Sequence, residues 1–393
     1  MTERDRVKVV VIGAGQAGLS AAYFLGARGL APGVDFVVLD ANDGPGGAWR
    51  HRWDSLTFGV AHGIHNLPGY PLDRPDSREP AREIVKRYYG AYEEHFGLPV
   101  VRPAPVASVV ETDPGFEIVT RDGRRWRSDA VINATGTWDR PFWPTVAGQR
   151  SFAGRQLHTR DYVAAEEFTG QRVLVVGGGT SAAQFLLQLA DAGVDTVWST
   201  RRPPDWTAQR FDQEWGIDVE RRVQAYTTQG LPTRSVVANT GLPLTDQYIA
   251  SIRSGVLVSR GPLVRLTETG AVLAVSGPGA DALPAQGDPV EEQRAEWVKS
   301  VRQLPGIAVE DGWQVEIDAV LWATGFRPVL NHLSPLGIRT RAGGITVGQD
   351  GVTAVDQPGL FLVGYGASAS TIGATRAGRK AASAALRMLR SVA

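Results

Sequence analysis

The pattern of apolar positions near the N-terminus predicts a buried strand, a glycine turn and a packed helix. Residues 7–12 form an almost continuous β-branched run, which is typical of a strand in a parallel sheet covered on both faces. The run leads into a glycine-rich turn at 13–18, and small apolar residues over 19–27 then favour a helix. A second apolar run at 36–39 ends at Asp40. The order is therefore strand, turn, helix, strand and acid.

The same order of elements recurs near the middle of the chain. An apolar run at 173–176 leads into a second glycine turn at 177–182, and the stretch 184–192 favours a helix. The next predicted strand, 196–199, ends at Thr200-Arg201-Arg202 rather than at an acid. Because one such unit could arise by chance but two are poorly explained by it, the repeat predicts two nucleotide-binding domains.

A second repeated motif supports two domains built on one plan. The segments 129–136 and 318–325 share the pattern Asp-Ala-Val-aliphatic-x-Ala-Thr-Gly, and each continues to a proline. The first follows a predicted hairpin with Asp122-Gly123 at its turn. Glycine turns and Ala-Thr-Gly segments alternate along the chain, so we expect an α/β fold with two Rossmann-like dinucleotide-binding domains.

Composition narrows the chemistry that is open to the chain. It has 393 residues, enough for two or three domains, and no cysteine. The lack of cysteine excludes disulfides, thiolate metal sites, cysteine nucleophiles and dithiol redox mechanisms in this sequence. The six histidines show no metal-ligand spacing, so no metal site is expected.

Charge and the N-terminal segment bear on partners and location. The 41 basic and 41 acidic residues give a formal net charge of zero, and hence no long-range field for nucleic acid or an anionic membrane. The N-terminal segment is charged and runs directly into the first predicted strand, unlike a signal peptide, and no apolar run approaches the roughly 18 residues of a membrane span. We expect a cytoplasmic protein with a small-molecule substrate and with neither nucleic acid nor membrane as partner.

The two glycine turns predict different nucleotides. In the first, a Gly-x-Gly-x-x-Gly turn lets the backbone approach a pyrophosphate at a helix N-terminus, and Asp40 can accept hydrogen bonds from a ribose diol. The second turn is followed by arginine, which can pair with a 2′-phosphate that a carboxylate would repel, so this turn favours NADPH. The alternative for these arginines is plain solvated surface charge. The candidate contacts are Gly13, Gly15, Gln16, Ala17, Gly18 and Asp40 in the first site, and Gly177, Gly179, Thr180, Ser181, Arg201 and Arg202 in the second.

Several motifs then resemble one family over nearly the whole chain. Phe152-x-Gly154-x-x-x-His158-x-x-x-Tyr162 is similar to the fingerprint of the flavin-containing and Baeyer–Villiger monooxygenases. The segments 46–49, 323–328 and 359–364 resemble further motifs of the flavin-containing monooxygenases. The resemblance implies an NADPH-binding domain with irregular insertions (151–325) inserted into an FAD-binding domain (1–150 and 326–393). A homodimer is an expectation of the family alone.

The resemblance also implies further cofactor contacts. These are Gly47, Trp49, Val106, Ala134, Thr135, Gly136, Gly364, Thr371, Ile372, Ala323, Thr324, Gly325 and His158. A helix expected from about residue 372 to 390 would point its N-terminus at the flavin and stabilise the negative charge of the reduced ring. For His158 two roles stay open, a structural anchor and an organiser of bound NADP. Phe152 and Gly154 are expected to be structural.

The activity that the resemblance implies is NADPH-dependent monooxygenation with FAD and O2. A C4a-(hydro)peroxyflavin would transfer one oxygen to a soft nitrogen or sulfur atom of a small molecule. Tyr162-Val163 departs from the ending usual in Baeyer–Villiger enzymes, which favours heteroatom oxygenation, although ketone oxidation stays an alternative. An NADPH:acceptor reductase and a non-catalytic redox sensor are further alternatives. Gly364-Tyr365 replaces the Gly-Asp of the disulfide reductases.

One departure from the family concerns the reactive face of the flavin. Animal-type members place an asparagine four residues after a serine, where this chain has Gly59 after Ser55. The nearest polar alternatives are His62, His65 and Asn66, and we take His62 as the candidate catalytic residue. The irregular segments 203–247 and 275–312 are interpreted as surface insertions, with a cover over the active site as the alternative.

Overall fold

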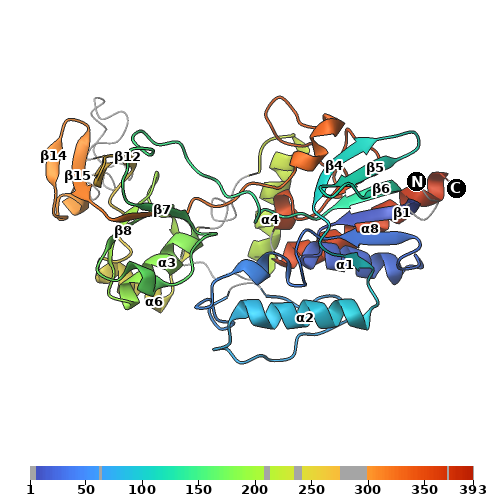
Figure 1. Cartoon of the computed structure of the whole chain (residues 1–393), viewed down its shortest axis with the longest axis horizontal. Helices are drawn as coiled ribbons and strands as arrows, with labels where there is room; N and C mark the ends of the chain where they lie inside the picture. The colour runs from blue at the N-terminus through green and yellow to red at the C-terminus, as the bar shows by residue number, and fades with distance from the viewer. Residues whose placement is uncertain are drawn as a thin grey trace. The chain divides into compact units, whose positions relative to one another are not determined.

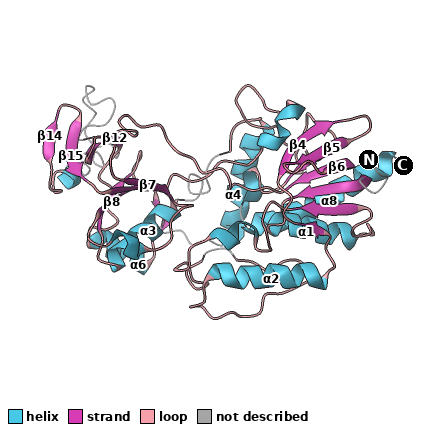
Figure 2. Cartoon of the chain, viewed as in Figure 1, coloured by secondary structure: helices cyan, strands magenta, loops and turns pink. Residues whose placement is uncertain are grey.

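A computed structural model describes residues 6–61, 64–207, 213–233, 241–274, 299–369 and 371–392. The chain divides into two units, each of mixed α/β structure (Figures 1 and 2). Unit 1 comprises Met1–Arg140, Asp212–Asn239 and Arg327–Ala393, and unit 2 comprises Pro141–Phe211 and Thr240–Phe326.

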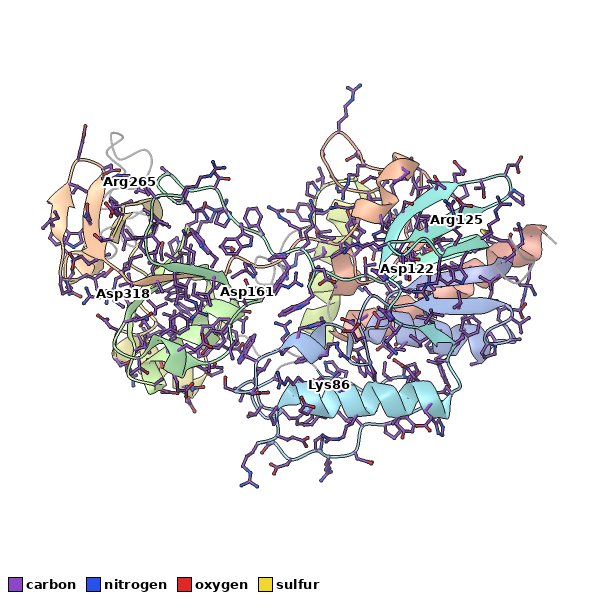
Figure 3. All side chains as sticks on the ribbon, viewed as in Figure 1. Lys86, Asp122, Arg125, Asp161, Arg265 and Asp318 are labelled. Carbon is purple, nitrogen blue, oxygen red and sulfur yellow. The ribbon has the colours of Figure 1, made fainter. Side chains whose placement is uncertain are left out.

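Unit 1 is built on a seven-stranded sheet of order β3-β2-β1-β6-β5-β4, with β17 paired to the end of β6. The parallel strands are β1 (Arg6–Ile12), β2 (Phe36–Leu39), β3 (Val100–Val101), β6 (Arg125–Asn133) and β17 (Leu360–Leu362). The antiparallel strands are β4 (Val106–Glu111) and β5 (Phe116–Thr120). The predicted hairpin is confirmed: Asp122-Gly123 joins β5 to β6, and Gly123 has φ +86° (Figure 3 labels Asp122 and Arg125 there).

Three helices cover one face of this sheet. Val9 and Val11 of β1 share a core with α1 (Gln16–Gly26), α2 (Ala81–His95) and α8 (Thr371–Val392), while Val10 and Ile12 face a second core. Burial on both faces explains the continuous apolar run. A Cβ at Gly378 of α8 would lie 2.7 Å from the Ala17 carbonyl oxygen, so α1 and α8 pack with their backbones almost in contact.

Unit 2 pairs a parallel sheet with an antiparallel one. The parallel sheet has the order β7 (Arg155–His158), β16 (Ala319–Trp322), β8 (Arg172–Val176) and β9 (Asp195–Ser199), and α3 (Thr180–Asp191) follows β8. The antiparallel sheet has the order β12 (Leu263–Leu266), β13 (Gly270–Leu273), β15 (Gly312–Glu316) and β14 (Ile307–Val309). Leu174, Val320 and Trp322 of the first share a core with Leu266, Leu273 and Val315 of the second.

The remaining elements are short, apart from one helix. They are η2 (Gly47–His51), η3 (Ala165–Phe168), β10 (Trp206–Thr207), α4 (Gln213–Thr228), β11 (Leu242–Pro243), α6 (Asp246–Arg253), η4 (Asn331–Leu336) and η5 (Gly366–Ala369). No helix in the described ranges has the length and apolar character needed to cross a membrane.

The two sheets repeat one plan, as the sequence predicts. The strand before each Ala-Thr-Gly segment, β6 or β16, pairs in parallel with the strand before the glycine turn, β1 or β8. The Gly13 N–H donates to the Leu39 carbonyl at 2.7 Å, and the Gly177 N–H donates to the Ser199 carbonyl at 3.0 Å. The prediction of two Rossmann-like domains in an α/β fold is confirmed.

The borders between the units differ from the predicted ones. Residues 141–150 lie in unit 2, where the Leu266 N–H donates to the Ala147 carbonyl at 2.8 Å. Residues 212–239 lie in unit 1, where Thr227 accepts from the Val347 N–H at 3.0 Å. Interpreting all of 203–247 as an insertion of the second domain is therefore wrong for its middle part. Residues 275–298, within the other predicted insertion, lie outside the described residues.

Candidate functional site

The three glycines of the first turn meet different surroundings. A Cβ at Gly13, which has φ +103°, would lie 2.6 Å from the Ala134 carbonyl oxygen, and one at Gly18 would lie 1.8 Å from the Gly13 carbonyl oxygen. A Cβ at Gly15 would have no atom within 4 Å. The outer glycines are thus required by the packing of α1 on the sheet, whereas the middle one borders open space that a ligand can approach closely.

The N-terminus of α1 is suited to an anion. Its N-cap is Gly15, and no side chain caps the helix. The N–H groups of the first turn have no partner within the helix, and together with the helix dipole they favour a phosphate. Gln16 and Ala17 are the first residues of this turn; the Gln16 side chain donates to the Thr375 hydroxyl of α8 at 3.1 Å.

Asp40 is buried in an ion-pair network that the sequence analysis did not identify. Its Oδ2 accepts from Nε of Arg102 at 2.7 Å, and Glu93 of α2 accepts from both terminal nitrogens of Arg102 at 2.6 and 2.7 Å. Asn42 donates to Asp40 Oδ1 at 3.3 Å. Burial alone would lower the pKa of Arg102, but the hydrogen bonds with Glu93 and Asp40 raise it above its usual value. The expected ribose acceptor is therefore held in place by residues distant in sequence.

The other expected contacts of unit 1 gather near the same turn. A Cβ at Gly47 (φ +53°) would lie 2.9 Å from Cα of Gly15, and one at Gly364 (φ +69°) would lie 3.7 Å from Cα of Gly136 (φ +62°). The Thr135 hydroxyl, next to Ala134, donates to the Val329 carbonyl at 2.6 Å. Thr135 and Gly136 follow β6 and Gly364 follows β17, so these three residues lie at the carboxyl ends of parallel strands, where α/β folds place their ligands.

Four expected contacts are less closely tied to this turn. Trp49 lies in η2 and packs against the helix-side core. Val106 begins β4 and packs against the core on the other face, two residues after Ala104, whose N–H donates to the Asp40 carbonyl at 2.7 Å. Thr371 and Ile372 begin α8, and their side chains lie outside the part that the structure describes.

The glycine turn of unit 2 repeats the geometry of the first. A Cβ at Gly177, with φ +146°, would lie 2.2 Å from the Ala323 carbonyl oxygen, as at Gly13 and Ala134. Gly179 is the N-cap of α3, which begins at Thr180 and Ser181 and has no side-chain cap. Gly325 has φ +78° with no atom within 4 Å of a Cβ, and the neighbouring Thr324 hydroxyl donates to the Phe142 carbonyl at 2.5 Å.

The two arginines after β9 are exposed, and within the described ranges no hydrogen bond or ion pair holds either side chain. Thr200, immediately before them, is buried; its N–H donates to the Gly261 carbonyl at 3.2 Å and its hydroxyl lies 2.6 Å from that of Ser259. The backbone is thus fixed while the guanidinium groups of Arg201 and Arg202 are available to an anionic ligand.

His158 is fully buried, and backbone groups engage both of its ring nitrogens. Nε2 donates to the Gly325 carbonyl at 3.0 Å, and Nδ1 accepts from the Arg160 N–H at 3.2 Å. These partners fix one neutral tautomer. Burial lowers the pKa of His158 and keeps the ring neutral. These contacts anchor the glycine of the second Ala-Thr-Gly segment, and a role of His158 in organising bound NADP stays a prediction.

The other fingerprint residues also pack within unit 2. A Cβ at Gly154 would lie 2.3 Å from the carbonyl oxygen of Asp318, labelled in Figure 3, and 2.4 Å from the Phe152 ring. Phe152 belongs to the core between the two sheets. The Tyr162 ring lies 4.4 Å from that of Phe185 on α3. The motif thus joins β7, β16 and α3.

The candidate catalytic residue His62 lies outside the described residues, so its role stays a prediction. At Gly59 the N–H donates to the Ser77 carbonyl at 2.8 Å, and a Cβ would lie 3.1 Å from that oxygen. Asn66 is engaged, since its Oδ1 accepts from the Leu72 N–H at 3.0 Å. Burial lowers the pKa of His65.

Comparison with known proteins identifies relatives over the whole chain. The profile of the pyridine nucleotide-disulphide oxidoreductase family matches residues 10–239. A mutant of the flavin monooxygenase from Stenotrophomonas maltophilia superposes with a TM-score of 0.75 at 34% identity, covering 99% of this chain and 100% of that one.

Curated relatives match between about half and nine-tenths of the chain. An uncharacterized CzcO-like oxidoreductase of Geobacillus kaustophilus is 31% identical over 47% of this chain, which spans about half of that relative (52%). The relatives also include a Baeyer–Villiger monooxygenase and the senecionine N-oxygenase of Tyria jacobaeae, the latter 28% identical over 66% of this chain and 63% of its own length.

Proposed function

We propose that this chain, which belongs to the pyridine nucleotide-disulphide oxidoreductase family and to the flavin monooxygenases, is a monooxygenase of small molecules. The cofactors that we propose are FAD and NADPH. One observation supports the proposal most strongly. Two glycine turns of the same geometry each lead into a helix whose N-terminus has no side-chain cap. The strand after the first helix is followed by the buried Asp40, whereas the strand after the second is followed by the exposed Arg201 and Arg202. The difference suits a free ribose diol at the first site and a 2′-phosphate at the second.

The residues of unit 1 fit a flavin dinucleotide. The open space beside Gly15 and the uncapped N-terminus of α1 suit a pyrophosphate, and the Asp40 carboxylate held by Arg102 suits a ribose. A bound flavin supplies hydride acceptance and O2 activation. The protein then contributes binding and orientation, so the activity requires no catalytic acid–base pair from the chain.

The residues of unit 2 fit NADPH in the same way. The uncapped N-terminus of α3 suits the pyrophosphate, and Arg201 and Arg202 can form bidentate pairs with the 2′-phosphate. His158 holds the backbone at Gly325, where a Cβ would have no neighbour within 4 Å. This arrangement leaves room for a ligand beside the second Ala-Thr-Gly segment.

We propose a soft nitrogen or sulfur atom as the site of oxygenation. The fingerprint ends in Tyr162-Val163, and senecionine N-oxygenase is among the relatives. In the overall reaction the substrate gains one oxygen atom from O2, NADPH gives a hydride and becomes NADP⁺, and the second oxygen atom takes up that hydride's electrons and hydrogen together with a proton from solvent and leaves as water. The chain has no cysteine, so it cannot cycle a dithiol of its own.

The experiment that tests this proposal measures coupling. The flavin-loaded protein is incubated with NADPH, ¹⁸O2 and methyl p-tolyl sulfide, N,N-dimethylaniline or a cyclic ketone. We expect slow NADPH oxidation without substrate and, with the sulfide or amine, about one labelled S-oxide or N-oxide per NADPH. A labelled lactone from the ketone would instead identify Baeyer–Villiger oxidation. Release of all the reducing equivalents as hydrogen peroxide, with rapid reduction of an added quinone, would show that the protein is a reductase.

A further inference from the structure

Arg52 of unit 1 lies among three tryptophan rings. It is the C-cap of η2, and its guanidinium carbon lies 4.3 Å from the centroid of the Trp138 ring and 5.8 Å from those of Trp49 and Trp53. These distances are within the range of cation–π attraction. We call Arg52 and these three residues the tryptophan box.

The charge of Arg52 has no acidic partner in the described part of the chain. Its Nε is buried without a hydrogen-bond partner. Two carboxylates near Arg52 in the sequence are paired with other arginines: Asp54 pairs with Arg82 at 2.6 Å, and Asp40 pairs with Arg102 at 2.7 Å. Burial lowers the pKa of Arg52 to about 10, with no opposing contribution from a carboxylate. The group is still charged at neutral pH, and a buried cation of this kind favours an incoming anion.

The box adjoins the proposed flavin site through the backbone on both sides. Gly47, which opens η2, lies against Gly15 of the glycine turn, and Trp138 follows Gly136 of the first Ala-Thr-Gly segment by two residues. The His51 ring stacks on Trp138 with centroids 6.2 Å apart, and its Nε2 lies 2.6 Å from Oδ1 of Asn42, a neighbour of Asp40. Arg52 as a whole is half-buried rather than fully buried.

We propose that the tryptophan box binds the carboxylate of an anionic substrate, with Arg52 as its counter-ion. This inference rests on the proposed function. The phosphates of the two dinucleotides are already matched by the N-termini of α1 and α3 and by Arg201 and Arg202, so the reactant left to carry an anion to this place is the substrate. A guanidinium presents a fork that fits a carboxylate bidentately, and the indole faces suit a planar body attached to it.

The test measures binding to the flavin-loaded protein at pH 7.5 by calorimetry. The probes are 4-(methylthio)benzoate and the neutral, nearly isosteric 4-(methylthio)benzamide. We expect the carboxylate to bind about tenfold tighter or more, as a charge-assisted pair would give. Arg52→Gln should bring the two dissociation constants to within about twofold, and Arg52→Lys, which keeps the charge but not the fork, should fall between.

A matched control removes the same charge two residues away. Arg50 lies in the same turn, donates to the Pro45 carbonyl at 2.8 Å and has no cation–π contact with the box, so Arg50→Gln should keep the preference for the carboxylate. The ratio of flavin to protein absorbance verifies that each variant is folded and loaded. Equal binding of both probes by the wild type, no binding of either, or a preference that survives Arg52→Gln would overturn the inference.

Product analysis separates this inference from the proposed function. Sulfoxide formed from both probes with equal binding constants would leave the monooxygenase activity standing and the carboxylate site refuted. Binding of the carboxylate that depends on Arg52, but with NADPH consumed and no sulfoxide formed, would support the anion site and contradict the oxygenase.

Discussion

At the scale of residues, the three glycines of the first turn differ in what surrounds them. The neighbours that a Cβ would meet at Gly13 and Gly18 are backbone atoms at 2.6 and 1.8 Å, which cannot yield, whereas Gly15 faces empty space in this structure. The three glycines are alike in sequence. The three-dimensional structure shows that the fold requires Gly13 and Gly18 and that a Cβ at Gly15 would have no neighbouring atom within 4 Å.

This difference predicts opposite effects of two alanine substitutions. Gly18→Ala should destabilise the protein by about 3 kcal/mol or more, because the backbone of α1 must move away from the sheet. Gly15→Ala should cost about 1 kcal/mol or less, because φ is −82° and the space is open, yet flavin content per chain should fall about tenfold. Urea unfolding and the visible spectrum measure both effects. A stable Gly15→Ala protein with full flavin would contradict the placement of the pyrophosphate.

A second residue-scale prediction concerns pH. His332 is buried and donates from Nε2 to Oδ1 of Asn133 at 2.6 Å; burial lowers the pKa of His332 to about 4. The unfolded chain therefore binds more protons than the folded one between pH 6.5 and 4, so stability is complete above pH 6.5 and falls as the pH is lowered through this window. The loss at pH 5 should be about 2 kcal/mol.

Comparison with a variant isolates that contribution. His332→Gln keeps a donor for Asn133 but does not titrate, so its unfolding free energy should fall less between pH 7.5 and 5 than that of the wild type. If the unfolding free energy fell by the same amount in both proteins between pH 7.5 and 5, protonation of His332 would not destabilise the folded state. Urea midpoints at the two pH values give the comparison.

The position of a site residue could be predicted from the sequence where neighbouring residues along the chain determine it. Asp40 follows a strand at the spacing expected after a glycine turn, so its place at the carboxyl end of β2 could be predicted from the sequence. Its partner Arg102 could not, because the two are 62 residues apart and meet only when β3 joins β2 and α2 brings Glu93 to the other side of the guanidinium. Arg52 shows the same limit, since Trp138 approaches it from a distant segment.

At the scale of elements, the residues that follow β9 lead us to expect a preference for NADPH over NADH. Thr200 fixes the backbone through Gly261 and Ser259, and this leaves Arg201 and Arg202 exposed for a 2′-phosphate. The double variant Arg201→Ala/Arg202→Ala should raise KM for NADPH by about tenfold or more and leave KM for NADH within about twofold. Steady-state oxidation of each nucleotide measures this. A similar loss for both nucleotides would refute the assignment.

Strands and helices were predictable where their pattern is self-contained. The runs that became β1, β2, β8 and β9 each contain a stretch of at least three consecutive buried residues, and each glycine turn marks the start of a helix. The antiparallel sheet of unit 2 was not predicted. Its strands are three to five residues long and gain their burial from the parallel sheet, so little of their pattern is visible along the chain.

At the scale of the whole molecule, the two units are expected to bind their nucleotides separately. The turn of unit 2 is closed by Ala323 and Ser199, residues of the same unit, and so does not depend on the first turn. Gly15→Ala should therefore bind NADP⁺ with a dissociation constant within about twofold of that of the wild type, by calorimetry. A tenfold weaker affinity would show that occupation of one site is needed to form the other.

The order of the domains was predictable and their borders were not. Repeats in the sequence locate the two turns, but they do not indicate that 212–239 returns to unit 1. That return depends on single long-range contacts, such as the Thr340 hydroxyl donating to the Gly230 carbonyl at 2.7 Å. A single long-range contact of this kind produces no repeating pattern in the sequence, so it could not be predicted.

The split of unit 1 into three segments sets an order for its formation during synthesis. Unit 2 has all of its residues once Phe326 has left the ribosome, whereas the first sheet still lacks β17 and its helix-covered face still lacks α8. Until α8 arrives, the apolar face of α1 that will pack against it stays uncovered on the nascent chain. The segment translated after unit 2 is therefore the one that completes unit 1.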